Sequence, residues 1–265
     1  MNTNSFVSGP DERVVSITRV DHGQWHAIDD RLDAVVGRTF SEHRPDGRLF
    51  VSIDAWHDTT FDLLAEAMVA GLPAPLYTVV DEADVDLTAC WRRAGFAVRR
   101  REWEYLVPTD PRVTGLENVE LPSDVRIVPA GAVDESLLRA VDLEIRAEVE
   151  ATLGWQSMPA EVLARPDGDT IGDVSMYAVA ATSDRYLGVI RVETVNQPRI
   201  GLVAVRADQH RRGIARALLA HALGTLHRSG VGEVWAEVHE SNRPASALFD
   251  GLGIRPVNSN VELVR

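Results

Sequence analysis

The stretch that most constrains the fold is residues 199–220, where an apolar strand passes through a polar turn into an amphipathic helix. The run at 202–205 is wholly apolar, which is typical of a strand covered on both faces. From Ile214 onward, apolar residues recur at helical spacing. Gly213 and Ala215 lie at the junction, beside Arg211 and Arg212. We therefore expect a covered strand that leads directly into a helix through small residues.

This junction has the chemistry of an anion site. The first N–H groups of a helix have no intrahelical acceptor, and the helix dipole favours negative charge there. Small residues let a phosphate approach the backbone, and the two arginines add positive charge. The residues alone therefore predict a pyrophosphate site. A dinucleotide-binding loop would need three spaced glycines and a Walker loop a Gly-Lys pair, whereas this turn has only Gly213 and the chain has no lysine.

Two motifs in this half of the chain resemble those of the GNAT acetyltransferase superfamily. The acyl-CoA signature Q/R-x-x-G-x-G/A is similar to the run His210, Arg211, Arg212, Gly213, Ile214 and Ala215, with histidine at the first position. The pattern N-x-x-A-x-x-L-Y-x-x-L-G-F is similar to the run from Asn242 to Ile254, with Phe249 where tyrosine is usual. Because order and separation also agree, residues 124–265 are identified as a GNAT domain.

The resemblance implies that acetyl-CoA is a co-substrate and that a neutral amine attacks its thioester carbonyl. Backbone N–H groups of the motif strand would polarise that carbonyl. The residues expected to bind the co-substrate are Val203, Ala204, Val205, His210, Arg211, Arg212, Gly213, Ile214, Ala215, Asn242, Ala245 and Phe249.

Proton transfer has several candidates. Glu237 interrupts an apolar strand, so it is either a base beside a cavity or the partner of an arginine. His239 lies two residues further on the same strand face and is a second candidate base, although a structural role is also open. Many GNAT enzymes use a tyrosine at the position of Phe249 as the acid. Here Ser241, water or unassisted departure of the thiolate are the alternatives.

The acceptor side is predicted from the acidic composition of residues 131–175, which contain ten acidic residues and three arginines. Glu144 and Glu148 are four residues apart and share a helix face, so they could attract an ammonium group or simply form a solvated surface. Trp155 could stack on a substrate or serve in packing. In the GNAT fold this helix and the following loop border the acceptor site.

An internal repeat predicts two similar domains. Residues 76–107, shifted by 158, fall on residues 234–265 with coincident apolar positions, and Gly95 then matches Gly253. The predicted fold is an α/β tandem GNAT fold, each domain having a mixed β-sheet flanked by helices. The expected domains are 1–108, a degenerate copy, and 124–265, joined by a Pro- and Gly-containing linker at 109–123.

Within the first copy, periodicity predicts strands at 13–19, 49–53 and 76–80 and helices at 61–70 and 87–94. A further helix is expected over 21–38, with Trp25, Ile28 and Leu32 on its apolar stripe, and a hairpin or paired strands over 96–107. In the second copy, the turn at 206–212 that precedes the predicted anion site is called the anion turn. Residues 54–60 hold the corresponding position in the first copy, and they contain two acids but neither glycine nor arginine. We therefore predict that this domain does not bind CoA.

Composition and charge narrow the classes of partner, ligand and location that the chain can have. A formal charge of −13 argues against nucleic acid as a partner and mildly favours a cationic substrate, although solubility alone would also explain it. No run of about eighteen apolar residues predicts a membrane span. The N-terminus does not resemble a signal peptide, Cys90 has no partner for an intramolecular disulfide, and no cluster has metal-ligand spacing. A cytoplasmic monomer or homodimer without a metal is expected.

The function these features predict is acetyl-CoA-dependent N-acyltransfer, an acetyl group moving to a primary amine of a small molecule. An alternative from another class is a non-catalytic acyl-CoA-binding or regulatory protein, because one copy is degenerate and Phe249 cannot donate a proton. O-acetylation and a protein substrate also remain open on the sequence.

Overall fold

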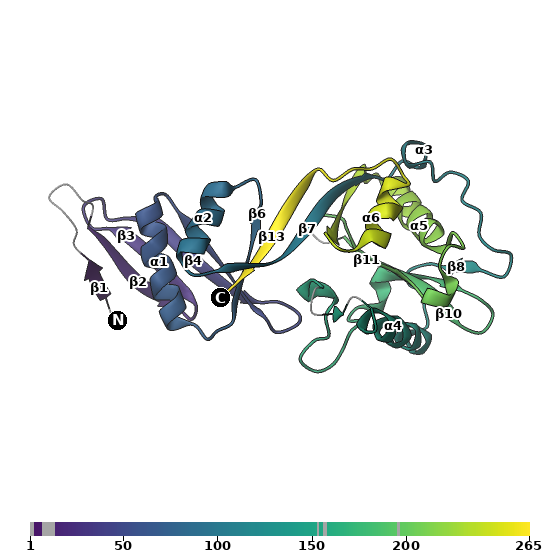
Figure 1. Ribbon diagram of the computed structural model, residues 1–265, viewed down its shortest axis with the longest axis horizontal. Helices are drawn as coiled ribbons and strands as arrows, with labels where there is room; N and C mark the ends of the chain where they lie inside the picture. Colours follow the sequence, from purple (N-terminus) through teal and green to yellow (C-terminus); the bar gives the residue numbers. More distant parts are fainter. Residues whose placement is uncertain (1–2, 7–13, 153, 156–157, 195–196) are drawn as a thin grey trace. The chain divides into compact units, whose positions relative to one another are not determined.

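The computed structural model describes residues 3–6, 14–152, 154–155, 158–194 and 197–265. The chain divides into two compact units: Met1–Arg101 with Asn260–Arg265 form unit 1, and Glu102–Ser259 form unit 2. Each unit has a mixed β-sheet with helices packed on it (Figure 1). The predicted α/β fold class is therefore confirmed.

Unit 1 has a sheet in the order β1-β2-β3-β4-β5-β6-β13. Its strands are β1 (Thr3–Phe6), β2 (Val15–Asp21), β3 (Gln24–Asp29), β4 (Ala34–His43), β5 (Leu49–Ala55), β6 (Leu76–Asp81) and β13 (Asn258–Val264). Its helices are α1 (Asp58–Gly71) and α2 (Val85–Arg93). Both helices contribute to one core cluster with the strands, in which Phe61 of α1 meets Trp91 of α2 edge to face. The predicted strands and helices of this half, apart from 21–38 and 96–107, are therefore present.

The helix predicted over residues 21–38 is wrong, because this segment forms β3 and β4. A tight turn at Gly23, with a φ of +80°, separates β3 from β2, and burial alternates along β3 with period two. Trp25 is buried, but Leu32 is 66% exposed, so the apparent helical stripe does not form one buried face. The apparent helical spacing of apolar residues came from two strands and the turn between them.

Unit 2 has a sheet in the order β7-β12-β11-β10-β9-β8. Its strands are β7 (Ala97–Pro108), β8 (Arg126–Val128), β9 (Tyr177–Ala181), β10 (Tyr186–Glu193), β11 (Arg199–Val205) and β12 (Glu233–His239). Its helices are α3 (Pro111–Thr114), α4 (Glu135–Glu150), η2 (Ala160–Val162), η3 (Val174–Met176), η4 (Ala207–Gln209), α5 (Ile214–Arg228) and α6 (Arg243–Asp250). Residues of α5 and α6 form one core cluster with the sheet, and residues of α4 form a second. This sheet is therefore covered by helices on both faces.

The last strand of each sequence repeat is exchanged between the units. β6 pairs antiparallel with β13, with Val261 opposite Val80, although β7 is the next strand along the chain. β12 in turn pairs antiparallel with β7 over residues 102–108. Figure 1 shows the yellow β13 entering the blue half of the chain beside β6. The repeat therefore predicted the elements but not their partners.

This exchange also moves the domain boundary. The division falls inside β7, between Arg101 and Glu102, and the chain's last six residues belong to unit 1, so the predicted limits of 1–108 and 124–265 differ from the observed units. β7 is a single strand where a hairpin or paired strands were expected. The predicted linker contains α3, capped by Asp110, and Leu116 is buried in the core of unit 2. Residues 109–123 are thus part of unit 2.

The exchanged strand predicts a local response to substitution. Leu263 of β13 is fully buried, so Leu263→Ala should destabilise unit 1 by about 2–5 kcal/mol. Hydrogen exchange should then show faster exchange in β6 while α5 keeps its protection. Val257→Ala, at an exposed position just before β13, is the matched control and should change neither. Loss of protection in α5 with β6 unaffected would contradict the assignment of β13 to unit 1.

Candidate functional site

The site begins where two parallel strands separate. β11 pairs with β12 only at Arg199 opposite Trp235 and Ile200 opposite Ala236. From residue 202 to residue 205, β11 keeps its antiparallel partner β10, but no pairing with β12 continues among the described residues. One edge of β11 therefore turns backbone groups toward a gap. The prediction that both strand faces are covered holds, since Val203 packs toward α5 and Leu202 toward α4, but residues 201–205 are only half-buried.

The gap opens toward the N-terminus of α5. Gly213 is the N-cap, with a φ of +80° and no capping side chain, and Arg211 also has a positive φ of 65°. Among the described residues, no protein acceptor bonds the backbone N–H groups of residues 213–216. The nearest atom to a Cβ built on Gly213 would be the Glu120 carbonyl oxygen at 3.7 Å, so this end of the helix is sterically open. Its geometry fits a pyrophosphate.

Charge at this turn favours an anion as well. Arg211 is exposed and has no ion-pair partner among the described residues, and Arg216 reaches only backbone carbonyl oxygens, at 3.4 and 3.5 Å. Arg212 is different, because its Nη2 donates to the Asp124 carboxylate at 2.9 Å. Arg216 is not part of the acyl-CoA motif at 210–215, but it follows the last residue of that motif. The arginines and the helix dipole together give the turn a positive potential.

His210 closes the turn against the strand. Its Nε2 lies 2.8 Å from the carbonyl oxygen of Val205, the last residue of β11. Histidine at the position of the family's Gln or Arg therefore bridges the two ends of the turn. The structure places it at the predicted site, in a supporting contact.

The two acids predicted for the acceptor side instead hold the base of this turn. Glu144 of α4 forms an ion pair with Arg206, with Oε2 2.8 Å from Nη1. Glu148 accepts a hydrogen bond from the backbone N–H of Ala207 at 2.7 Å and lies 3.9 Å from Arg206. They do share a helix face, as predicted. Their contacts make them positioning residues for the anion turn.

Trp155 is a packing residue in this structure. Its Nε1 donates to the carbonyl oxygen of Arg146 at 2.9 Å, and the Arg146 guanidinium lies 4.5 Å from the ring centroid. The alternative of a packing role, open on the sequence, is the one these contacts support.

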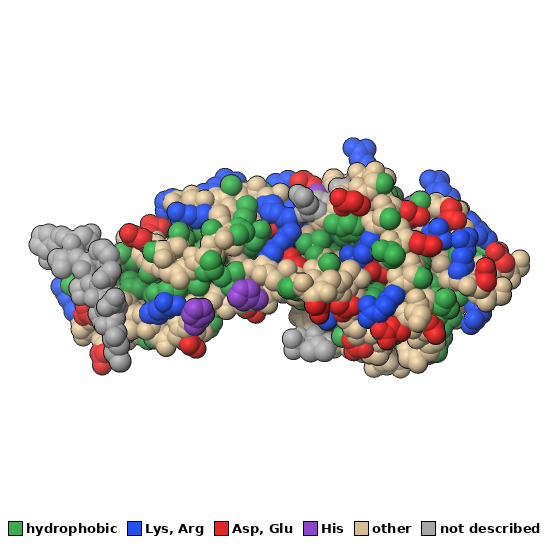
Figure 2. All heavy atoms as spheres, turned by 90° about the horizontal axis from the view of Figure 1, so that it is seen from below, with side chains coloured by type: hydrophobic (Ala, Val, Ile, Leu, Met, Phe, Trp, Pro, Cys, Tyr) green, Lys and Arg blue, Asp and Glu red, His purple; other side chains and the backbone are tan. Residues whose placement is uncertain are grey.

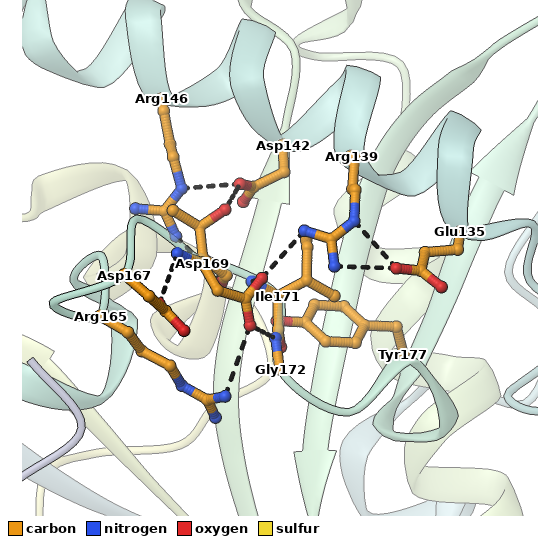
Figure 3. A network of polar contacts seen from close by, with 11 residues as sticks. Glu135, Arg139, Asp142, Arg146, Arg165, Asp167, Asp169, Ile171, Gly172 and Tyr177 are labelled. Atoms are coloured by element: carbon orange, nitrogen blue, oxygen red, sulfur yellow. Dashed lines mark hydrogen bonds and ion pairs between the residues drawn. The ribbon is translucent and has the colours of Figure 1, made fainter.

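A polar network ties the loop at residues 162–172 to α4 (Figure 3). Asp142 accepts hydrogen bonds from Arg146 at 2.7 Å and from the Thr170 hydroxyl at 2.5 Å. Arg139 donates to Asp169, whose carboxylate also accepts from the backbone N–H groups of Ile171 and Gly172. These hydrogen bonds hold the loop at residues 162–172 against α4, beside the sheet.

The candidate bases lie together on one face of β12. Burial alternates along the strand, so Glu237 and His239 are both half-buried on the face opposite Ala236, as predicted. Glu237 forms an ion pair with Arg199 at 2.8 Å, which is the arginine partner that the sequence left open. Nδ1 of His239 lies 2.7 Å from the Ser241 hydroxyl and accepts from the Ser241 N–H at 3.2 Å. Thus Ser241 is joined to His239 rather than standing alone.

Sequence reasoning missed most of the charged groups on this face. Strand register places Glu104 opposite Glu237 and Glu102 opposite His239. Next to them, Glu193 of β10 contacts Arg191 at 3.1 Å and Arg199 at 3.8 Å. The signal available in the sequence was charge within apolar strands, the same signal that identified Glu237. For the β7 residues no local signal existed, because Glu104 pairs with Glu237, on a strand far away in the sequence.

Several carboxylates lie near Arg199. Burial lowers the pKa of Arg199, but nearby carboxylates raise it by more, so it lies above its ordinary value. These carboxylates belong to Glu237, Glu193, Glu161 and Glu102. Glu161 comes from η2, whose backbone oxygen at this residue accepts from Arg191 at 3.0 Å. Over the face of unit 2 that Figure 2 shows, acidic and basic side chains are likewise interspersed.

The second motif forms the start and core face of α6. Asn242 is the N-cap, and its Oδ1 accepts from the Ala245 N–H at 3.2 Å, which explains the three-residue spacing in physical terms. Phe249 is 4% exposed and stacks on Tyr105 of β7. In this structure Asn242 and Ala245 therefore serve the helix terminus, beside the expected co-substrate site.

No three His, Cys, Asp or Glu side chains in the described part of the chain are grouped to hold a metal ion. Within the described ranges, none of the helices has the length and hydrophobicity needed to span a bilayer.

Comparison with known proteins agrees with this geometry. Residues 146–254 match the acetyltransferase (GNAT) family. The [ribosomal protein bS18]-alanine N-acetyltransferases of Escherichia coli K12 and Salmonella typhimurium are each 45% identical to the chain over 51 residues, or 19% of this chain. The aligned part spans about a third of the length of these relatives, 34%.

Solved structures show the fold over nearly the whole chain. A tandem GNAT protein from the clavulanic acid biosynthesis pathway has a TM-score of 0.63 at 16% identity, covering 97% of this chain and 84% of that one. A GCN5-related N-acetyltransferase from Sphaerobacter thermophilus has a TM-score of 0.62 at 18% identity, covering 94% and 82%. The tandem plan predicted from the repeat is therefore confirmed.

The loop network predicts a pH response. Hydrogen bonds from Arg139 and from the Gly172 and Ile171 N–H groups lower the pKa of Asp169 to about 2. Because this pKa is depressed, the anchor is intact above the ordinary carboxyl range and is lost as pH falls through about 2. In an NMR titration, the amide protons of Ile171 and Gly172 should shift with that midpoint.

In Asp169→Asn this transition should be absent. Asp184→Asn, which removes an exposed carboxylate from the β9–β10 turn, is the matched control and should leave it unchanged. A midpoint near 4 in the unmodified protein would show that Arg139 does not hold the carboxylate.

Proposed function

We propose that the protein transfers an acetyl group from acetyl-CoA to a primary amine of a small molecule, because residues 146–254 match the acetyltransferase (GNAT) family. The observation that carries this proposal is the early separation of β11 from β12, with its gap opening toward the uncapped end of α5. The free edge of β11 therefore leads to the N-terminus of α5. An extended thioester with a pyrophosphate at its far end fits such a path.

In this proposal the pyrophosphate binds the N–H groups of residues 211–216, with Arg211 and Arg216 supplying positive charge. The pantetheine arm follows the free edge of β11, where residues 203–205 offer backbone groups to its amides and to the thioester carbonyl. Gly213 is suited to the cradle because its positive φ favours glycine and no atom crowds it.

Proton removal from the amine is assigned to the pair His239 and Ser241. The Ser241 hydroxyl takes the proton from the attacking nitrogen while passing its own to Nδ1 of His239, 2.7 Å away. Glu237 is a weaker candidate, because its ion pair with Arg199 stabilises the carboxylate and so disfavours proton uptake.

The charged face supports a cationic acceptor. The carboxylates of Glu237, Glu193, Glu161 and Glu102 all lie close enough to Arg199 to raise its pKa. A sheet face that carries several carboxylates can attract an ammonium group and disfavours a substrate carboxylate. Small amines without a carboxylate are therefore the proposed acceptors, and the enzyme would act in the cytoplasm.

We propose no co-substrate site in unit 1. β5 and β6 also pair at only two positions, Leu49 opposite Leu76 and Phe50 opposite Tyr77, so the strands separate there too. The turn that follows has no glycine, however, and Asp58 occupies the first turn of α1. A carboxylate at a helix N-terminus competes with a phosphate for the same positive potential.

A second function is supported by one observation, the absence of a hydroxyl at Phe249. The protein would then bind acyl-CoA without turning over an amine. Its discriminating result is saturable acetyl-CoA binding with no thiol release from any amine tested.

Binding is tested by calorimetric titration of acetyl-CoA. Gly213→Trp should weaken affinity by about a hundredfold or more, because the indole would cover the N–H groups at the start of α5. Gly230→Trp is a matched control: it also has a positive φ and open surroundings, but lies past the other end of α5. It should bind as the unmodified protein does.

One binding event per chain is expected. Two events would contradict the proposal that unit 1 is empty, and no binding would contradict the proposed function.

Acceptor preference is tested by thiol release with monoamines, diamines, amino acids and a peptide beginning with alanine. Diamines should give a higher kcat/KM than amino acids, and Glu193→Gln should reduce the diamine value by about tenfold, a charge effect of roughly 1.4 kcal/mol. Glu233→Gln removes an exposed acid from the start of β12 and should have no effect. Preference for the peptide would replace the small-molecule proposal with a protein substrate.

A further inference from the structure

Phe249 leaves the proposed reaction without a tyrosine on α6, but a tyrosine from another strand lies against it. The rings of Phe249 and Tyr105 are stacked, with centroids 4.6 Å apart and planes at 24° (Figure 1 shows their elements, α6 and β7). Both side chains are buried, at 4% and 2% exposure. The phenol therefore occupies the space directly beside the position from which a tyrosine on α6 would act.

Strand register places Tyr105 close to the point where β11 and β12 separate. Tyr105 is directly opposite Ala236 of β12, and Ala236 is opposite Ile200 of β11. The pair Ala236–Ile200 is the last before the gap, and residues opposite each other in a sheet share a face. Tyr105 is therefore one strand away from the closed end of the gap, on the face that also carries the small side chain of Ala236.

No hydrogen-bond partner of the Tyr105 hydroxyl is found in the described part of the chain, and the residue is 2% exposed. A buried tyrosine hydroxyl normally has a partner. The other tyrosines of unit 2 follow this rule: Tyr177 donates to the Ile171 carbonyl oxygen, and Tyr186 accepts from the Asp134 N–H. Tyr105 thus has a donor available at the end of the gap.

We propose that Tyr105 is the general acid of the transfer reaction, taking the role that Phe249 cannot fill. This inference rests on the proposed function. The amine nitrogen forms a bond to the thioester carbon, the carbon–sulfur bond breaks, and the leaving sulfur takes the Tyr105 proton. The amine proton leaves through Ser241 to His239, which releases it to solvent, and solvent returns a proton to Tyr105. The products are an amide and free CoA thiol, so atoms and charge balance.

Ser241 is the donor that the sequence first suggested, but its hydroxyl is bound to His239 on the other face of β12. Tyr105 lies on the core face, with Ala236 and α6. The two groups therefore serve opposite proton movements from opposite faces of the sheet.

The first test is kinetic. Tyr105→Phe keeps the stacked ring and removes only the hydroxyl, so kcat should fall by about a hundredfold with the KM for acetyl-CoA little changed. Adding Phe249→Tyr to this variant returns a hydroxyl from α6 and should restore most of the activity. Tyr77→Phe, in unit 1, is the control and should leave kcat unchanged. Full activity in Tyr105→Phe would overturn the proposal while leaving the acetyltransferase function intact.

The second test does not depend on turnover. If the hydroxyl contacts the sulfur, the unmodified protein should bind CoA about tenfold more tightly than desulfo-CoA, and Tyr105→Phe should bind the two equally. Unchanged discrimination in the variant would show that Tyr105 does not reach the sulfur. This comparison tests whether Tyr105 reaches the sulfur even if no amine is acetylated. A failure to acetylate any amine would contradict the proposed function, but it would not decide the placement of Tyr105.

Discussion

The hydrogen bonding between β11 and β12 ends after two residue pairs, and the arrangement of unit 2 follows from this. Backbone groups that lose a sheet partner need another partner, since a buried unpaired N–H or C=O costs about 1–3 kcal/mol. Here they face a gap that continues to the uncapped start of α5. The strand edge and the helix terminus thus present unsatisfied polar groups along one line, which suits an extended ligand with an anionic end.

Ion pairs fix the surroundings of this gap. Glu144 and Glu148 hold Arg206 and the backbone of Ala207, so α4 positions the turn that precedes α5. The same helix holds the loop at 162–172 through Arg139 and Arg146. One helix therefore supports both the anion turn and the wall beside the charged sheet face. Three of the carboxylates that raise the pKa of Arg199, those of Glu237, Glu193 and Glu102, lie instead on the sheet.

Strand exchange gives unit 2 residues that its own repeat does not contain. β7 carries Tyr105 toward the core face and Glu102 and Glu104 toward the charged face of the same sheet. β13 in return completes unit 1, where Glu262 pairs with Arg100 at 3.0 Å. A degenerate first copy thus still contributes side chains to the sheet that carries the proposed site.

By itself the sequence determined the strand–turn–helix at residues 199–220, the capped start of α6 and the family to which they point, because each depends on neighbours a few residues apart. It also predicted that Glu237 and His239 lie on one face of a strand, as they do on β12. It was wrong over residues 21–38, where apolar spacing fitted a helix although Gly23 turns the chain into a hairpin. Only the tertiary structure decided that β7 pairs with β12 and β13 with β6. The two repeats carry similar final strands, and backbone hydrogen bonds form equally well with either, so the choice depends on packing between residues far apart in the chain.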